Sequence, residues 1–232
     1  MFSALQLAAV EKRIVAACQR AGRDRSEITL VGVTKTVTFP EVVAASASGL
    51  HKFGENRVQE AAPKIAAARE KALAVEWHLI GHLQTNKAKD AAALFDVIQS
   101  VDSVRLAEAL QKHAEKLQRR LEVFAQVNTS AEASKFGVAP TEAVVLAREI
   151  AAFPNLHLAG LMTIGALTED VDKIRVCFRT LRQLHAEILA LHLPNTTMRH
   201  LSMGMTDDFE IAIEEGATIV RIGRAIFGER TS

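Results

Sequence analysis

The stretch ITLVGVTKTVTFPEVV, Ile28 to Val43, changes character near its midpoint. Residues 28–33 are apolar and rich in branched side chains, as in a strand that is buried on both faces. Thr34 and Lys35 follow, and Pro40 then suits the first turn of a helix. A buried strand that leads directly into a helix is the repeating unit of parallel α/β folds.

The same alternation continues to the end of the chain. Ser3 is placed to cap a helix that runs to about Ala21, ahead of the first strand. Asp207 and Asp208 are expected in the first turn of a late helix, where acidic groups meet the positive end of the helix dipole. The predicted strands cover residues 28–35, 51–55, 76–81, 95–101, 122–129, 156–164, 199–204 and 217–223, and helix-like stretches include 103–120, 141–152, 170–192 and 207–215.

Strands that are each followed by a helix or a short turn predict a single (β/α)8 TIM-type barrel of the α/β class, with an extra N-terminal helix. The length of 232 residues is close to the ~250 residues typical of this fold. No linker rich in Gly, Ser or Pro divides the chain, so we expect one domain over residues 1–232. An open doubly wound sheet is the alternative, because periodicity identifies strands without showing how the sheet closes.

Composition excludes several classes of partner. A formal net charge of +1 and a hydrophobic content of 49% indicate a globular protein with a large core. Binders of nucleic acids or membrane surfaces usually carry a basic excess, so neither partner is expected. The apolar segments are too short to span a bilayer and the N-terminus lacks a basic lead, which predicts a cytoplasmic protein. Cys18 and Cys177 have no CxxC partner and are expected to be buried free thiols.

Lys35 lies where the first predicted strand ends. The carboxyl ends of the strands carry the chemistry of a parallel barrel. Lys35 shares the strand parity of Val31 and Val33, so its side chain is expected to point into the barrel mouth. Partial desolvation or a nearby cation would favour the neutral amine, which forms a Schiff base with an aldehyde. A solvated lysine at a strand end is the alternative.

Two glycine-containing loops follow the last two predicted strands. They are SMGMTDD, which starts at Ser202 and contains Gly204, and RIGRAIFG, which starts at Arg221 and contains Gly223. Glycine allows a ligand to approach the backbone closely, and free amides at a helix start favour an anion. Because barrels often bind phosphate after strands seven and eight, this pair of loops predicts a phosphate site.

Arg221 lies between two apolar residues of the last predicted strand. A buried guanidinium has five donors and no acceptor, so it needs an ion pair or a ligand acceptor, and both remain open. Opposite a pyridine nitrogen, an arginine would disfavour protonation of the ring. His78 and His82 lie on a strand and its exit with no third ligand evident, so no metal is expected, and His78 is interpreted as a wall or core residue.

Longer motifs extend this interpretation to a family. VGVTK, FGENRVQE, WHLIGHLQTNK, VNTSAEASKFG, GLMTI, LSMGMTDDFEIAIEEGATIVRIG and AIFG occur in this order between Ile28 and Gly228. The chain resembles the pyridoxal-phosphate homeostasis proteins, a fold-type III family of pyridoxal-phosphate (PLP) binders whose barrel is similar to the N-terminal domain of alanine racemase. The resemblance covers nearly the whole chain.

The resemblance implies a role for each matching residue. Lys35 would form the internal aldimine with PLP, and Arg221 would face the pyridine nitrogen. Lys135, in SKFG, matches a second family lysine with a role in cofactor transfer or release. The phosphate would be held by Ser202, Gly204, Gly223 and Arg224, partly through backbone N–H groups, and the ring pocket would be lined by Asn56, His78 and Met162.

The chain departs from the family pattern at two positions. Many relatives have a small hydroxyl residue where Arg224 stands, so a hydroxyl contact to phosphate is exchanged for a cation. Thr206 stands where serine is common, which keeps the hydroxyl and adds a methyl group.

The family implies a protein that holds PLP for intracellular homeostasis or delivery, with apo PLP-dependent enzymes as partners and no clear catalytic activity. Amino-acid racemases share the barrel but add a C-terminal β domain and a tyrosine base from a partner subunit. This sequence ends soon after the eighth predicted strand and contains no tyrosine. We therefore expect a non-enzymatic monomer. A racemase or other weak PLP enzyme and a cofactor-free Schiff-base aldolase are the alternatives.

Overall fold

A closed ring of parallel strands forms the centre of the protein. The computed structural model describes residues 2–132 and 134–228, and within them the strands pair in chain order, with β1 closing the ring against β8. The predicted barrel is confirmed, and the open doubly wound sheet is wrong. The strands are β1 Thr29–Val33, β2 Lys52–Glu55, β3 Glu76–Leu79, β4 Val97–Val101, β5 Leu121–Gln126, β6 Leu156–Met162, β7 Thr196–Ser202 and β8 Ile219–Ile222.

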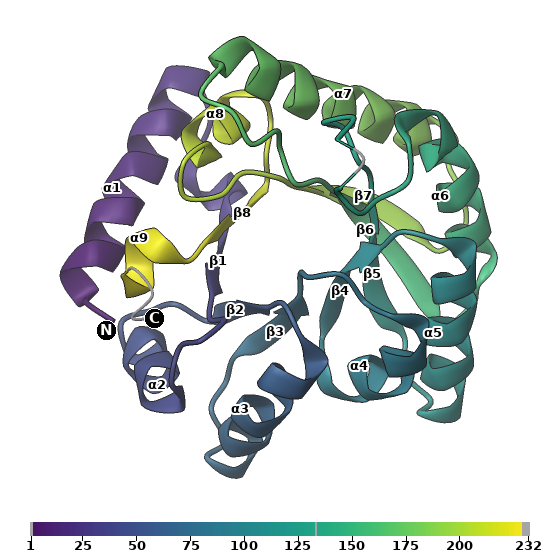
Figure 1. Cartoon of the computed structure of the whole chain (residues 1–232), viewed down its shortest axis with the longest axis horizontal. Coiled ribbons are helices and arrows are strands. Elements are labelled where there is room, and N and C mark those ends of the chain that lie inside the picture. Colours follow the sequence, from purple (N-terminus) through teal and green to yellow (C-terminus); the bar gives the residue numbers. More distant parts are fainter. Residues whose placement is uncertain (1, 133, 229–232) are drawn as a thin grey trace.

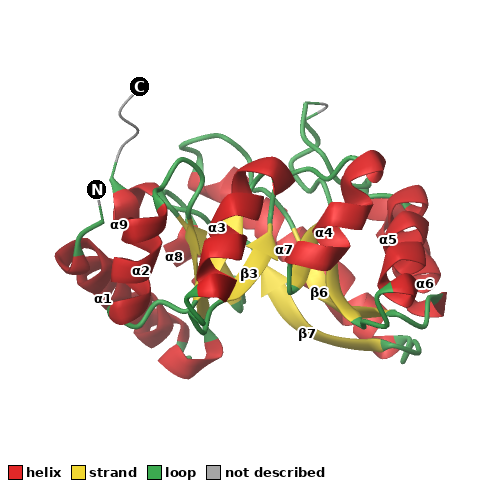
Figure 2. Cartoon of the chain, turned by 90° about the horizontal axis from the view of Figure 1, so that it is seen from below, coloured by secondary structure: helices red, strands yellow, loops and turns green. Residues whose placement is uncertain are grey.

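Helices surround this ring (Figure 1), and Figure 2 shows them flanking the strands in a side view. They are α1 Ala4–Ala21, α2 Phe39–Ala47, α3 Val58–Glu70, α4 Ala88–Leu94, α5 Val104–Lys116, α6 Ala143–Ala152, α7 Val171–Ala190, α8 Phe209–Glu214 and α9 Arg224–Phe227, with short 3-10 turns at Arg25–Glu27, Thr85–Lys87 and Pro140–Glu142. No helix in these described ranges is both long enough and apolar enough to cross a membrane.

The extra helix α1 packs on α8 and α9, the two helices that follow the last strands. Its buried face includes Leu7, Val10 and Ile14. On its flank, Arg13 Nη2 lies 2.9 Å from Glu210 Oε2 and Arg20 Nε lies 2.8 Å from Glu214 Oε1, both on α8. The N-terminal helix therefore supports the part of the barrel that carries the two glycine loops.

The apolar core has two parts. The larger part fills the space between the strands and the helices. The smaller part fills the barrel itself with Val31, Val97, Phe124, Ala159, Met162 and Ile219. Cys18 and Cys177 are buried free thiols, as predicted.

Local geometry corrects three expectations. β1 ends at Val33 rather than at Lys35, because Val37 N donates to Thr34 O at 3.0 Å and closes a turn in which Thr36 has φ 65°. Ser3 precedes α1 but makes no side-chain cap. Asp207 and Asp208 lie before α8 and not in its first turn.

Candidate functional site

The turn that carries Lys35 is held through the preceding residue. Thr34 N donates to Gly54 O at 2.9 Å, and Thr34 Oγ1 donates to Glu55 Oε1 at 2.7 Å. Lys64 Nζ, from α3, donates to Thr34 O at 2.6 Å. These hydrogen bonds fix the residue next to Lys35, although Lys35 itself has left the strand.

Glu55 and Lys64 form a buried ion pair beneath this turn. Lys64 Nζ lies 2.7 Å from Glu55 Oε1, and the glutamate side chain is fully buried. Glu55 is visible in the sequence as a strand-end carboxylate, but nothing local marks Lys64. A lone lysine in the alanine-rich helix α3 is its only signal, because the pairing depends on how α3 packs on the barrel.

Lys35 opens onto a hollow of about 770 Å³ at the edge of the barrel mouth. Gly223 and Arg224, which follow β8, line the same hollow. The structure thus brings the predicted lysine together with one of the two predicted phosphate loops. The remaining lining comes from the β1–α2 connection, α2, α9 and Phe2.

Arg221 lies inside the barrel and is 3% exposed. Its Nη1 donates to Ser202 Oγ at 2.6 Å, and its Nη2 donates to Thr163 O at 2.7 Å. Both acceptors are neutral, and within the described residues these bonds use two of the five N–H donors. Burial lowers the pKa of Arg221 to about 10, against the opposing effect of the Asp208 carboxylate. The guanidinium is therefore still charged at neutral pH and has donors to spare.

His78 is buried, with 2% of its surface exposed. Its Nδ1 is 2.8 Å from Gln99 Nε2, and Gln99 Oε1 accepts a hydrogen bond from Ser202 Oγ at 2.6 Å. Gln99 is a site residue that was not predicted. Its signal is a fully buried amide in the middle of the apolar strand β4.

The other predicted residues occupy separate places. Met162 is fully buried among the apolar side chains inside the barrel. Gly204 accepts a hydrogen bond from Arg221 N at 3.0 Å through its carbonyl. Asn56 is half-buried, and a Cβ at Gly81 would lie 2.3 Å from Asn56 O, so the loop after β3 must have glycine there to pack on it.

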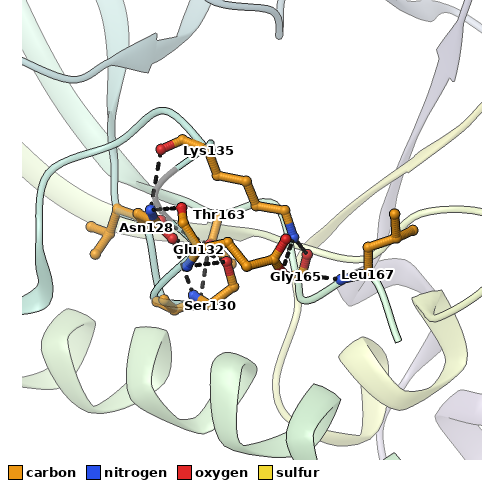
Figure 3. A network of polar contacts seen from close by, with 9 residues as sticks. Asn128, Ser130, Glu132, Lys135, Thr163, Gly165 and Leu167 are labelled. Atoms are coloured by element: carbon orange, nitrogen blue, oxygen red, sulfur yellow. Dashed lines mark hydrogen bonds and ion pairs between the residues drawn. The ribbon is translucent and has the colours of Figure 1, made fainter. Parts of the chain in front are cut away.

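Lys135 joins two loops at the mouth (Figure 3). Its Nζ donates to Gly165 O, after β6, and to Glu132 Oε1, after β5, both at 2.7 Å. Asn128 closes the β5 loop by donating to Glu132 O at 2.9 Å and to Lys135 O at 3.1 Å. The second family lysine is thus a tie between loops in this structure.

The loop after β7 holds two acidic residues in different surroundings. Asp208 accepts from Met205 N at 2.6 Å, and burial raises the pKa of its carboxyl. Asp207 is exposed and forms an ion pair with Arg224. The Arg224 cation therefore has an anionic neighbour on the adjoining loop.

A second group of charges lies toward the amino ends of the strands. Lys52 Nζ contacts both carboxylate oxygens of Glu76, at 2.8 and 2.7 Å. The His78 ring and then Lys52 lower the pKa of Glu76 to about 2. Burial, assisted by Arg199, lowers the pKa of His200 to about 4, so this imidazole is neutral at pH 7. Within the described ranges, no three His, Cys, Asp or Glu side chains gather as a metal site requires.

Comparison with known proteins places this barrel in a class and then in a family. Residues 5–231 match the family model described as alanine racemase, N-terminal domain. A curated relative from Aquifex aeolicus, named pyridoxal phosphate homeostasis protein, is 44% identical over 97% of both chains. The chain therefore belongs to the pyridoxal phosphate homeostasis protein family.

Solved structures agree with that membership. A protein of unknown function from Bifidobacterium adolescentis has a TM-score of 0.91 and 40% identity, covering 97% of this chain and 94% of its own. PipY of Synechococcus elongatus, solved with PLP bound, has a TM-score of 0.81 and 33% identity, covering 94% of this chain and 100% of its own.

Replacing Glu55 with Gln tests whether the Glu55–Lys64 ion pair stabilises the turn that carries Lys35. The substitution leaves Lys64 largely buried without a carboxylate, so we expect the free energy of unfolding to fall by about 3 kcal/mol in urea titrations. Glu60→Gln is the control, because its partner Arg57 is exposed and such a pair contributes less than about 1 kcal/mol. Equal effects of the two substitutions would contradict a stabilising role of the buried Glu55–Lys64 pair.

The lowered pKa of His200 predicts a pH dependence of stability. Between pH 6.5 and about 4 the unfolded chain binds a proton at this imidazole and the folded chain does not. Stability contributed by the neutral ring is therefore lost as pH falls through that window. NMR titration should place the His200 midpoint near 4, and His200→Gln should lose less stability between pH 7 and pH 5 than wild type. The exposed His51, changed to Gln, should retain the wild-type dependence.

Proposed function

We propose that this protein binds PLP as a Schiff base on Lys35 and acts in intracellular PLP homeostasis or delivery, without turnover of its own. The binding unit is one barrel domain over residues 1–232, working as a cytoplasmic monomer. Membership of the pyridoxal phosphate homeostasis protein family supports this proposal, as does the PLP-bound structure of PipY.

The observation that carries the proposal is the buried cation of Arg221. It contacts a hydroxyl and a carbonyl, and among the described residues no carboxylate is hydrogen-bonded to its guanidinium. A buried charge needs further acceptors, and the lone pair of a pyridine nitrogen is one. Because that arginine would keep the ring nitrogen unprotonated, the bound ring would be a weak electron sink, which suits storage.

The residues of the mouth fit the remainder of the cofactor. Lys35 Nζ would add to the aldehyde carbon, a C=N bond would form, and the carbonyl oxygen would leave as water. Gly223 and Arg224 line the hollow beside Lys35 and would hold the phosphate. Ser202 and Gly204, from β7 and the loop after it, would also hold the phosphate, and both are hydrogen-bonded to Arg221. Asn56, His78 and Met162 would bound the ring side of the pocket.

Lys35→Ala tests the attachment. Wild-type protein mixed with PLP and reduced with borohydride should gain one stable adduct, and mass mapping should find it in the Lys35 peptide. Lys35→Ala should lose the adduct, because the amine that adds to the aldehyde is removed. Lys135→Ala is the matched control and should keep it. A wild-type protein that takes up no PLP, or a label that stays in Lys35→Ala, would overturn the proposal.

A second assay separates a carrier from a racemase. Racemisation needs a proton donor on each face of the substrate α-carbon, and the chain has no tyrosine to serve as one of them. The PLP-loaded protein, incubated with single amino-acid enantiomers in deuterated water, should show no sustained deuterium incorporation. Continued turnover would establish an enzyme. Transfer of PLP to an apo-enzyme faster than release into solution would support delivery.

A further inference from the structure

A line of polar side chains, joined by three hydrogen bonds and one close charge contact, runs through the barrel from the site toward its opposite end. It starts at Arg221 on β8, continues through Ser202 on β7 and Gln99 on β4, and reaches His78 and Glu76 on β3. Its inner members are buried: Ser202 and Gln99 have no exposed surface and His78 is 2% exposed. Glu76 is the member nearest solvent, with 36% of its side chain exposed.

Donor and acceptor chemistry fixes the direction of the hydrogen bonds at the Arg221 end of the line. Arg221 can only donate, so Ser202 Oγ accepts from it at 2.6 Å. Ser202 then has a single hydrogen, which it donates to Gln99 Oε1 at 2.6 Å. If the Gln99 amide were reversed, the Ser202 oxygen would face two donors. Its own hydrogen would then have no acceptor among the hydrogen bonds of the described residues.

The same logic fixes the imidazole. With Gln99 Oε1 committed to Ser202, the amide nitrogen donates to His78 Nδ1 at 2.8 Å. Nδ1 is therefore the bare nitrogen, and the neutral ring carries its proton on Nε2. Nε2 lies 2.7 Å from Glu76 Oε1 but off the line of a straight hydrogen bond, so this last contact is mainly electrostatic. Lys52 holds the Glu76 carboxylate in place.

We propose that Glu76, His78 and Gln99 are positioning residues that orient Arg221 toward the cofactor, a role that rests on the PLP-binding function proposed above. The Glu76 carboxylate favours the proton on His78 Nε2, and the bare Nδ1 then accepts from the Gln99 amide nitrogen. The amide oxygen in turn accepts the Ser202 hydrogen, so the Ser202 lone pairs are left to Arg221 without a competing donor. A charge near the amino ends of the strands thereby sets the direction of a guanidinium at the cofactor site.

The predicted hydrogen-bond directions can be tested without any ligand, through the tautomer of His78. Nitrogen-15 NMR of the unliganded protein at pH 7, with His78 assigned by comparison with His78→Gln, should show the neutral ring protonated on Nε2. A ring protonated on Nδ1, or on both nitrogens, would overturn the proposal. This measurement reads the tautomer in the unsubstituted protein, and the His78→Gln variant is used only to assign the signal.

The consequence for the site is tested by PLP titration, followed by the absorbance of the bound chromophore. Glu76→Gln and Gln99→Leu should each raise the Kd for PLP about three- to tenfold, the range expected for one misaligned buried hydrogen bond. The double variant should bind no more weakly than the weaker single variant, because both break one line. Additive losses would mean that the two residues act independently.

Glu122→Gln is the matched control. Burial, and then the nearby Glu76 carboxylate, raise the pKa of the Glu122 carboxyl, but Glu122 is not part of the line. The Kd of Glu122→Gln should stay within about twofold of wild type. An equal loss in Glu122→Gln, or an unchanged Kd in folded Glu76→Gln, would overturn the positioning role. A wild-type protein that binds no PLP would instead contradict the proposed function. The His78 tautomer would still test the hydrogen-bond directions along the line.

Discussion

Closure of the barrel by β8 against β1 is the constraint on which the site depends. Val31 pairs with Arg221 and Gly32 with Ile222, so segments from opposite ends of the chain run side by side. Lys35 follows one of these strands and Gly223 follows the other, and both line one hollow. In an open sheet of the same strand order, β1 and β8 would be far apart, and Lys35 would not lie beside the loop that follows β8.

This constraint also explains the supporting structure. The turn after β1 must hold Lys35 outside the regular strand, and the Glu55–Lys64 pair holds Thr34 for that purpose. On the other side, α1 packs on α8 and α9 and covers the last two strand–helix units. Lys135 joins the loops after β5 and β6. Connections around much of the ring are thus tied by contacts that are distant in sequence.

The fold could be predicted from sequence because burial leaves a local pattern: apolar strands followed by helical periodicity mark each unit. Lys35 and Gly223 followed from that pattern, because strand ends meet at one mouth, whereas Arg224 was implied by the family resemblance. The end of β1 could not be predicted, since it is set by a turn with a positive φ at Thr36 and by a lysine from α3. Gln99 could not be placed either, because a buried amide has meaning only once its cross-barrel partners are known.

Placing an arginine inside the barrel, rather than a neutral hydrogen-bond donor, carries a desolvation cost that the surrounding residues must offset. Removing a guanidinium from water is expensive, and a direct carboxylate partner would offset the cost but would also use the donors that a ligand needs. Arg221 instead contacts neutral dipoles, and the Asp208 carboxylate favours its charge although, among the described residues, it makes no hydrogen bond to the guanidinium. The charge is stabilised through polarised groups while its remaining donors stay available. A remote counter-ion therefore reconciles burial with a ligand site in a way that an adjacent one does not.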